Sequence, residues 1–272
     1  MRWSSTWPRS GSAAEPATAS AVPDVTTRPS NAQEAEARIR SMFDRIAGRY
    51  DLLNTIMSAR MHHRWRERTV ELASPPRGGR ALDVCCGTGD LALTLKRRMG
   101  AQADVVGIDF SDQMLELARQ KSSSQGIDVS YEAGNALELP YPDSSFDVAT
   151  VGFGIRNLVD LERGVGEMAR VVRPGGRVAI LEITTPRRPP LSWFYSIWFF
   201  RIVPLLGVLT RDRQAYSYLP DSVRRFPAAP ALAQLMTDAG LTSVHYTLLA
   251  GGIVAIHVGR VADETGGPLE AR

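Results

Sequence analysis

The chain has 272 residues, of which 44% are hydrophobic and 22% charged, so it can bury the core of one large α/β domain. The net charge is only +3, and no basic stripe alternates with stacking aromatic residues, which argues against a nucleic-acid partner. No apolar run is long enough to cross a bilayer as a helix.

Residues 1–33 are rich in Ser, Ala, Pro and Thr, and this composition predicts a disordered tail. Its arginines and serines also resemble an organellar transit peptide, but Glu15, Asp24 and several prolines argue against that alternative. The two cysteines, Cys85 and Cys86, are adjacent and make a poor disulfide framework, so we expect a reduced, cytoplasmic protein. The four histidines show no metal-ligand spacing with cysteines or carboxylates, and no metal is expected.

Apolar residues at helical spacing begin near Asn31 or Gln33 and predict a helix that Gly48 interrupts. A second helix is expected to run to about Ala73. Residues 34–74 would then form a helical cap that precedes the sheet and covers a cofactor site.

From Arg80 onward, short apolar segments alternate with helical patterns, as in right-handed βαβ units with a parallel sheet. The predicted strands cover residues 81–85, 104–109, 128–133, 146–151, 177–182, 244–249 and 253–258. Gly251 and Gly252 join the last two as a hairpin, which places one antiparallel strand in the sheet. The predicted fold is α/β, a Rossmann-like doubly wound sheet of seven strands.

An aromatic segment at 191–206 interrupts this alternation after the fifth strand. One interpretation is a buried helical cover. The other is an interfacial face that contacts a bilayer, because arginines flank the aromatic residues. The predicted domain organisation is a domain at 34–260 with an insertion at 186–226, between the tails 1–33 and 261–272.

Gly87 and Gly89 form a tight turn after the first strand, where glycine lets the backbone approach a ligand closely. Asp109 ends the second strand, where a doubly wound sheet holds ribose hydroxyls. This pattern also fits a dinucleotide. Asp83, placed to meet the loop amides or an amino-acid group, and the strand end Asn135–Ala136, placed to bracket an adenine, favour S-adenosylmethionine (SAM) over NAD.

Several motifs carry a resemblance to known enzymes. LDVCCGTGD, GIDFS and RVVRPGG resemble class I SAM-dependent methyltransferases. FDRIAGRYDLLNTIMS, HHRW, GFGIRN and YSYLPDSV, in that order, closely resemble the UbiE/MenG family of quinone C-methyltransferases over residues 38–260. The resemblance implies SAM as co-substrate and a polyprenylated quinol as acceptor. It favours demethylmenaquinol, while the equivalent ubiquinone precursor or another small lipophilic acceptor stays open.

Carried over position by position, the resemblance places cofactor contacts at Thr88, Asp109, Asn135 and Ala136. Gly152 occupies a further cofactor position that is often Ser in the family. Because glycine has no hydroxyl, any contact there must come from its backbone.

Arg156 and Asn157 follow the fourth strand, at the edge of the sheet where acceptors bind. As a permanent cation, Arg156 could stabilise a quinolate, and Asn157 could hydrogen-bond a ring oxygen. The alternatives are an Arg156 that pairs with Asp51 or Asp160, and an Asn157 that caps the next helix.

Tyr50 and Asp51 lie on the helical cap, where Tyr50 would cover the cofactor and Asp51 or His63 would act as a base. The alternative for Tyr50 is packing against Trp65. Two rival functions remain: a methyltransferase for a soluble acceptor, and a non-catalytic scaffold that retains the cofactor. A lipophilic acceptor would bring peripheral contact with the inner face of the membrane, and a homo-oligomer is compatible with the sequence.

Overall fold

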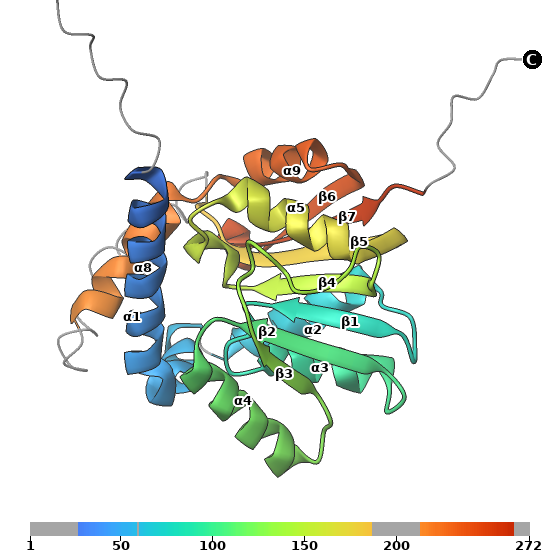
Figure 1. Ribbon diagram of the computed structural model, residues 1–272, viewed down its shortest axis with the longest axis horizontal. Helices are drawn as coiled ribbons and strands as arrows, with labels where there is room; N and C mark the ends of the chain where they lie inside the picture. The colour runs from blue at the N-terminus through green and yellow to red at the C-terminus, as the bar shows by residue number, and fades with distance from the viewer. Residues whose placement is uncertain (1–26, 59, 187–212, 264–272) are drawn as a thin grey trace, which may run out of the picture.

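The computed structural model describes residues 27–58, 60–186 and 213–263 (Figure 1). Their seven-stranded sheet has the order β3-β2-β1-β4-β5-β7-β6. Its strands are β1 (Arg80–Val84), β2 (Asp104–Asp109), β3 (Ser130–Ala133), β4 (Phe146–Gly152), β5 (Val172–Ile183), β6 (Leu241–Leu249) and β7 (Val254–Val261). Only β7 runs antiparallel to its neighbours β5 and β6. The predicted α/β fold with one antiparallel strand is confirmed.

Helices cover both faces of the sheet (Figure 1). One face packs against α2 (Met61–Ala73), α3 (Asp90–Met99) and α4 (Asp112–Gln125), the other against α5 (Leu161–Val171) and α9 (Ala229–Asp238). Successive strand residues alternate between the two cores, because their side chains point to opposite faces. In β1, Ala81 joins the first core and Leu82 the second.

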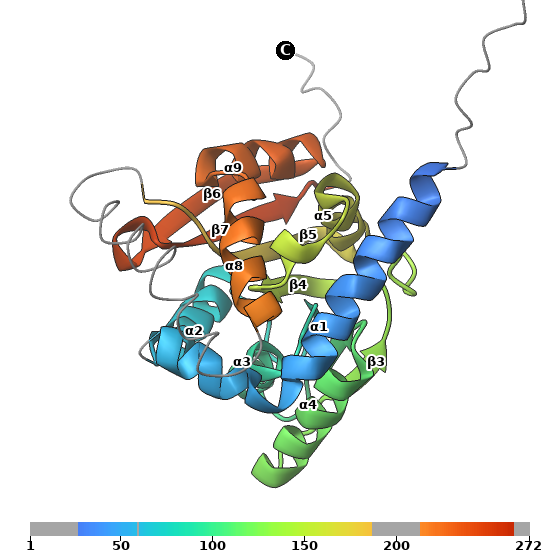
Figure 2. The same cartoon turned by 90° about the vertical axis from the view of Figure 1, so that its left-hand side faces the viewer.

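The N-terminal helix α1 (Thr27–Met57) is continuous, so the predicted interruption at Gly48 is wrong. A helical glycine costs only about 1 kcal/mol relative to alanine, and buried Met42 and Ala47, which both precede Gly48, supply packing that outweighs it. The helix also begins earlier than predicted, at Thr27. Figure 2 shows α1 lying across the end of the sheet, with α8 (Arg213–Arg225) beside it.

The start of β5 differs from the prediction. β5 takes in the turn at 174–176 that was expected to precede it, with a register shift opposite Phe146 and Val148. The terminal hairpin is confirmed, and its turn is the short helix η3 (Ala250–Gly252). Among the described residues, no helix combines the length and apolar character that crossing a membrane requires. The aromatic segment at 191–206 lies outside the described residues.

Candidate active site

A loop at 85–89, called the glycine loop below, joins the carboxyl end of β1 to α3. Gly87 and Gly89 have φ values of 53° and 82°, in the left-handed region that favours glycine. A Cβ at Gly89 would collide with the hydroxyl of Tyr131, so both conformation and space require glycine there. Cys85 also has a positive φ, 52°, and lines the pocket described below.

Asp109 anchors this loop from the neighbouring strand. One carboxylate oxygen accepts a hydrogen bond from the backbone N–H of Gly87 at 2.9 Å, and the other accepts from Ser111 at 2.9 Å. Ser111 in turn caps α4 by accepting from the N–H of Met114. Burial raises the pKa of Asp109, and the backbone hydrogen bonds partly offset this. The carboxylate therefore links the glycine loop to the start of α4.

A pocket with about 720 Å³ of free space, including its open mouth, lies between the glycine loop, α1 and η1 (Ile155–Asn157). The predicted site residues that line it are Tyr50, Gly87, Asp109, Asn135, Ala136, Gly152 and Asn157. Tyr50 and Asn157, which are 107 residues apart in the sequence, thus line the same cavity. Thr88, Gly89, Asp83, Asp51 and Arg156 do not line it.

The pocket-lining positions differ in how they are held. The side-chain oxygen of Asn135 accepts from the N–H of Leu137 at 2.9 Å, and its amide nitrogen lies 3.4 Å from Glu36 on α1. A Cβ at Gly152 would lie 3.1 Å from the side chain of Leu91. A side chain at Gly152 would therefore require Leu91 to shift by a few tenths of an ångström.

Asp51 and Thr88 form a hydrogen bond that links α1 to the glycine loop. The Thr88 hydroxyl donates to Asp51 at 2.6 Å, and the ammonium of Lys121 lies 2.6 Å from the Asp51 carboxylate. Lys121 also contacts Thr88 and Asp90. Asp51 does not line the pocket and its carboxylate is paired with a cation, so its role as a base stays a prediction that this pairing disfavours. Thr88 likewise turns its hydroxyl to Asp51.

Asp83 lies beneath the pocket and not in its wall. The carboxyl is 1% exposed and accepts a hydrogen bond from Thr150 at 2.8 Å, while its second oxygen has no hydrogen-bond partner. Burial raises the pKa of Asp83 to about 7. Asp83 does not line the pocket, so its predicted contact with an amino-acid group of the ligand stays a prediction.

Replacing Asp83 by asparagine is expected to raise thermal stability more at about pH 8 than at about pH 5. The folded-state pKa of about 7 lies above the ordinary value of 3.8, so folding retains a proton that the unfolded chain has lost. The free energy of unfolding then falls as pH rises through this window, by a few kcal/mol at ~1.4 kcal/mol per pKa unit. Melting temperatures at both pH values test this, with the exposed Asp104→Asn as control; equal shifts would contradict it.

Tyr50 reaches the glycine loop from α1. Its ring packs edge-on against Phe43, with 6.1 Å between centroids, while Trp65 packs against Phe153. The alternative that Tyr50 packs on Trp65 is therefore wrong. Burial raises the pKa of the Tyr50 phenol, and the charge of Arg156 opposes this.

Arg156 forms a buried ion pair that the sequence did not reveal. Its guanidinium donates to Glu182 at the end of β5 at 2.8 Å and also to the carbonyl of Phe153. The Arg156 and Glu182 side chains are 7% and 1% exposed. Neither of the two partners considered from the sequence, Asp51 and Asp160, pairs with Arg156. The signal for Glu182 is a lone carboxylate directly after the apolar run at 178–181 of β5.

Asn157 stands beside this ion pair and faces the pocket. The hydroxyl of Tyr218 on α8 donates to the Asn157 side-chain oxygen at 3.0 Å. The amide nitrogen of Asn157 remains for a ligand. Asp160, and not Asn157, caps α5 by accepting from the N–H of Arg163.

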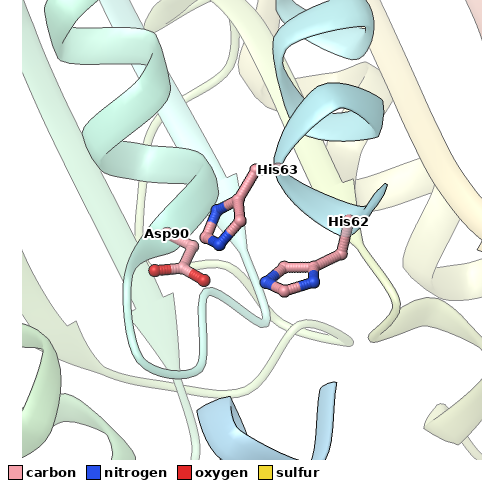
Figure 3. Close-up of side chains that lie close together, drawn as sticks. All are labelled: His62, His63 and Asp90. Atoms are coloured by element: carbon pink, nitrogen blue, oxygen red, sulfur yellow. The ribbon is translucent and has the colours of Figure 1, made fainter. Parts of the chain in front are cut away.

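His62, His63 and Asp90 lie close together although their sequence spacing did not indicate it (Figure 3). Burial and nearby positive charge lower the pKa of His62 to about 4, and its Nδ1 lies 2.6 Å from the hydroxyl of Ser58. Two cations already hold Asp90, Lys121 at 2.7 Å and Arg66 at 3.2 Å. Their charge opposes a metal ion at this cluster, and His63 faces Asp90 instead of the pocket.

Comparison with known proteins identifies the family. A sequence profile of the ubiE/COQ5 methyltransferase family matches residues 31–261, most of the chain. The chain belongs to this family. A demethylmenaquinone methyltransferase of Thermus thermophilus is 47% identical over 219 residues, which cover 80% of this chain and 99% of that protein. One from Bacillus licheniformis is 42% identical over 228 residues, covering 84% and 98%. A Yersinia enterocolitica ubiquinone/menaquinone biosynthesis C-methyltransferase UbiE is 40% identical, covering 84% and 92%.

Solved structures resemble this ubiE/COQ5-family chain at the level of the fold. A SAM-dependent methyltransferase from Thermotoga maritima aligns with a TM-score of 0.58 at 20% identity, over 81% of this chain and 98% of that one. Another from Aquifex aeolicus gives 0.55 at 19% identity, over 72% and 89%. Together with the family match, these similarities confirm the predicted methyltransferase fold and the predicted family.

Proposed function

We propose that the protein transfers the methyl group of SAM to a ring carbon of a polyprenylated quinol, converting demethylmenaquinol to menaquinol. The observation that carries this proposal is similarity to proteins named demethylmenaquinone methyltransferase, at up to 47% identity among the relatives compared, over 80–84% of this chain and 98–99% of those proteins. Relatives at 38–40% identity are named ubiquinone/menaquinone C-methyltransferases, so the ubiquinone precursor is the second candidate.

The donor would occupy the end of the pocket at the glycine loop. Gly87 leaves room for close approach of a ligand, since the nearest atom to a Cβ there is on Tyr50, 4.0 Å away. Asp109 retains acceptor capacity for ribose hydroxyls because each carboxylate oxygen can take a second hydrogen bond. Asn135 and Ala136 would flank the adenine, and Tyr50 would close the site from α1.

The acceptor would enter at the other end, at residues 152–159. When bound, SAM supplies a methyl group that the ring carbon attacks in line as the sulfur leaves with the bonding electron pair, and the methylated ring carbon then loses its hydrogen as a proton to restore the aromatic ring. The ring carbon must be electron-rich, and loss of a quinol hydroxyl proton, with a phenol pKa of about 10, makes it so. Arg156 would stabilise the quinolate charge and Asn157 would hold a ring oxygen, so both lower the cost of that ionisation.

We further propose that the protein meets its lipophilic acceptor at a membrane surface. Leu52, Ile56 and Met61 are exposed at the corner between α1 and α2, with exposed fractions of 61%, 53% and 42%. Exposed Arg60 and Arg64 lie in the same segment. An apolar corner with neighbouring cations suits an anionic interface.

An acceptor comparison tests the proposed function. Purified protein, isotope-labelled SAM and reduced demethylmenaquinone should give labelled menaquinone, identified by mass spectrometry. The corresponding benzoquinol precursor, assayed in parallel, should react at least about tenfold more slowly in kcat/KM, a difference of ~1.4 kcal/mol. Faster benzoquinol methylation would favour the second candidate, and no transfer to either would reject the proposal.

A further inference from the structure

We infer that Glu182 is a positioning residue for the acceptor: it fixes the guanidinium of Arg156 behind the loop at 153–157 and balances its charge at the acceptor end of the pocket. This inference rests on the proposed function, because it concerns how the quinol would be ionised. It adds a residue that lies outside every motif that carried the family resemblance.

The geometry shows that Glu182 holds Arg156 at more than one point. One carboxylate oxygen accepts from the Arg156 guanidinium at 2.8 Å and from the backbone N–H of Ile183 at 2.8 Å. The other oxygen lies 3.4 Å from the backbone N–H of Arg156. Both ends of Arg156 are therefore fixed to the end of β5, and the guanidinium also clamps the Phe153 carbonyl. The clamped turn is the one that presents Asn157 to the pocket.

The charges of Arg156 and Glu182 act on other ionisable groups around the acceptor end of the pocket. Arg156 acts on two phenols, Tyr50 in the pocket wall and Tyr218, which bonds Asn157. Arg66 on α2 also acts on Tyr50, and Arg225 on α8 also acts on Tyr218. Glu182 in turn acts on Cys85 in the glycine loop, together with Asp109 and Asp83. Glu182 is the carboxylate paired with Arg156, at 1% exposure, so solvent does not screen it. The potential that a bound quinol experiences thus depends on Glu182.

Glu182→Gln tests this dependence, because glutamine keeps the shape and one acceptor oxygen but leaves Arg156 unbalanced. The probe is a naphthol without a prenyl chain, whose ionisation changes its absorbance. Its pKa in the complex should fall by about 1 to 2 units relative to the wild-type complex. The acidic limb of the kcat/KM profile should move to lower pH by a similar amount. Affinity for SAM in calorimetry should stay within about threefold.

Two further variants keep the test decisive. Glu182→Asp retains the charge but withdraws the carboxylate by one methylene, so it should raise the acceptor KM and leave the naphthol pKa unchanged. If Glu182→Gln does not fold, the double variant Arg156→Met/Glu182→Met removes both charges and should raise the naphthol pKa. An unshifted naphthol pKa in a folded, SAM-binding Glu182→Gln, or in the double variant, would overturn the inference. The naphthol measurement needs no methyl transfer, so its failure is distinguishable from failure of the proposed function.

Discussion

Asp109→Ala is expected to weaken SAM binding by about 100-fold or more, which corresponds to ~2.7 kcal/mol. The carboxylate serves two purposes at once: it would accept the ribose hydroxyls, and it pins the glycine loop through the N–H of Gly87. Charge-assisted hydrogen bonds of this kind contribute roughly 1.5–3 kcal/mol each. Alanine removes both contributions, and calorimetric titration of SAM measures the loss.

The matched control for this variant lies on the same strand. Asp104 starts β2 at its opposite end and pairs with exposed Arg80 at 2.7 Å. Exposed pairs contribute at most about 1 kcal/mol to stability, and this pair lies far from the pocket wall. Asp104→Ala should therefore leave SAM affinity within about twofold. If Asp109→Ala bound SAM with near-native affinity, Asp109 would not be part of the proposed SAM site.

Local patterns were enough to predict the sheet and the donor end of the pocket. The glycine turn, the carboxylate that ends β2 and the cap at Ser111 follow rules that act over a few residues. Parallel strands place their carboxyl ends at one edge, so Asp109 and Asn135 had to be neighbours. The fold could be predicted because hydrophobic periodicity and turn chemistry agree along the whole sheet.

Partners that lie far apart in sequence could not be predicted in this way. Arg156 and Glu182 are 26 residues apart, and nothing local shows that the end of β5 meets the turn after β4. Lys121 and Asp51 are held together by the docking of α1 onto α4, which depends on tertiary packing. Asp51 was therefore assigned as a base when its carboxylate is already paired. The same packing explains why Gly48 fails to break α1.

Arg156→Ala is expected to destabilise the fold by about 3–5 kcal/mol, the usual effect of removing one partner of a buried ion pair. The remaining Glu182 carboxyl is 1% exposed, and burial already raises its pKa above the ordinary value. Loss of the nearby cation raises the Glu182 pKa further. A carboxyl with a raised folded-state pKa stabilises the fold in its protonated form, so the variant should be most stable at low pH. Its stability should fall as pH rises through that pKa, which chemical denaturation across pH measures.

Turnover should fall by about 100-fold or more in Arg156→Ala, while SAM affinity changes far less, because Arg156 acts at the acceptor end. Misfolding could mimic this loss, and the double variant Arg156→Met/Glu182→Met separates the two causes. Replacing both members of a buried pair by apolar side chains of similar volume is often neutral for stability. The double variant should therefore regain most of the lost stability without regaining turnover. If the double variant recovered both stability and turnover, the Arg156 charge would contribute only to the stability of the fold. Another group would then stabilise the quinolate.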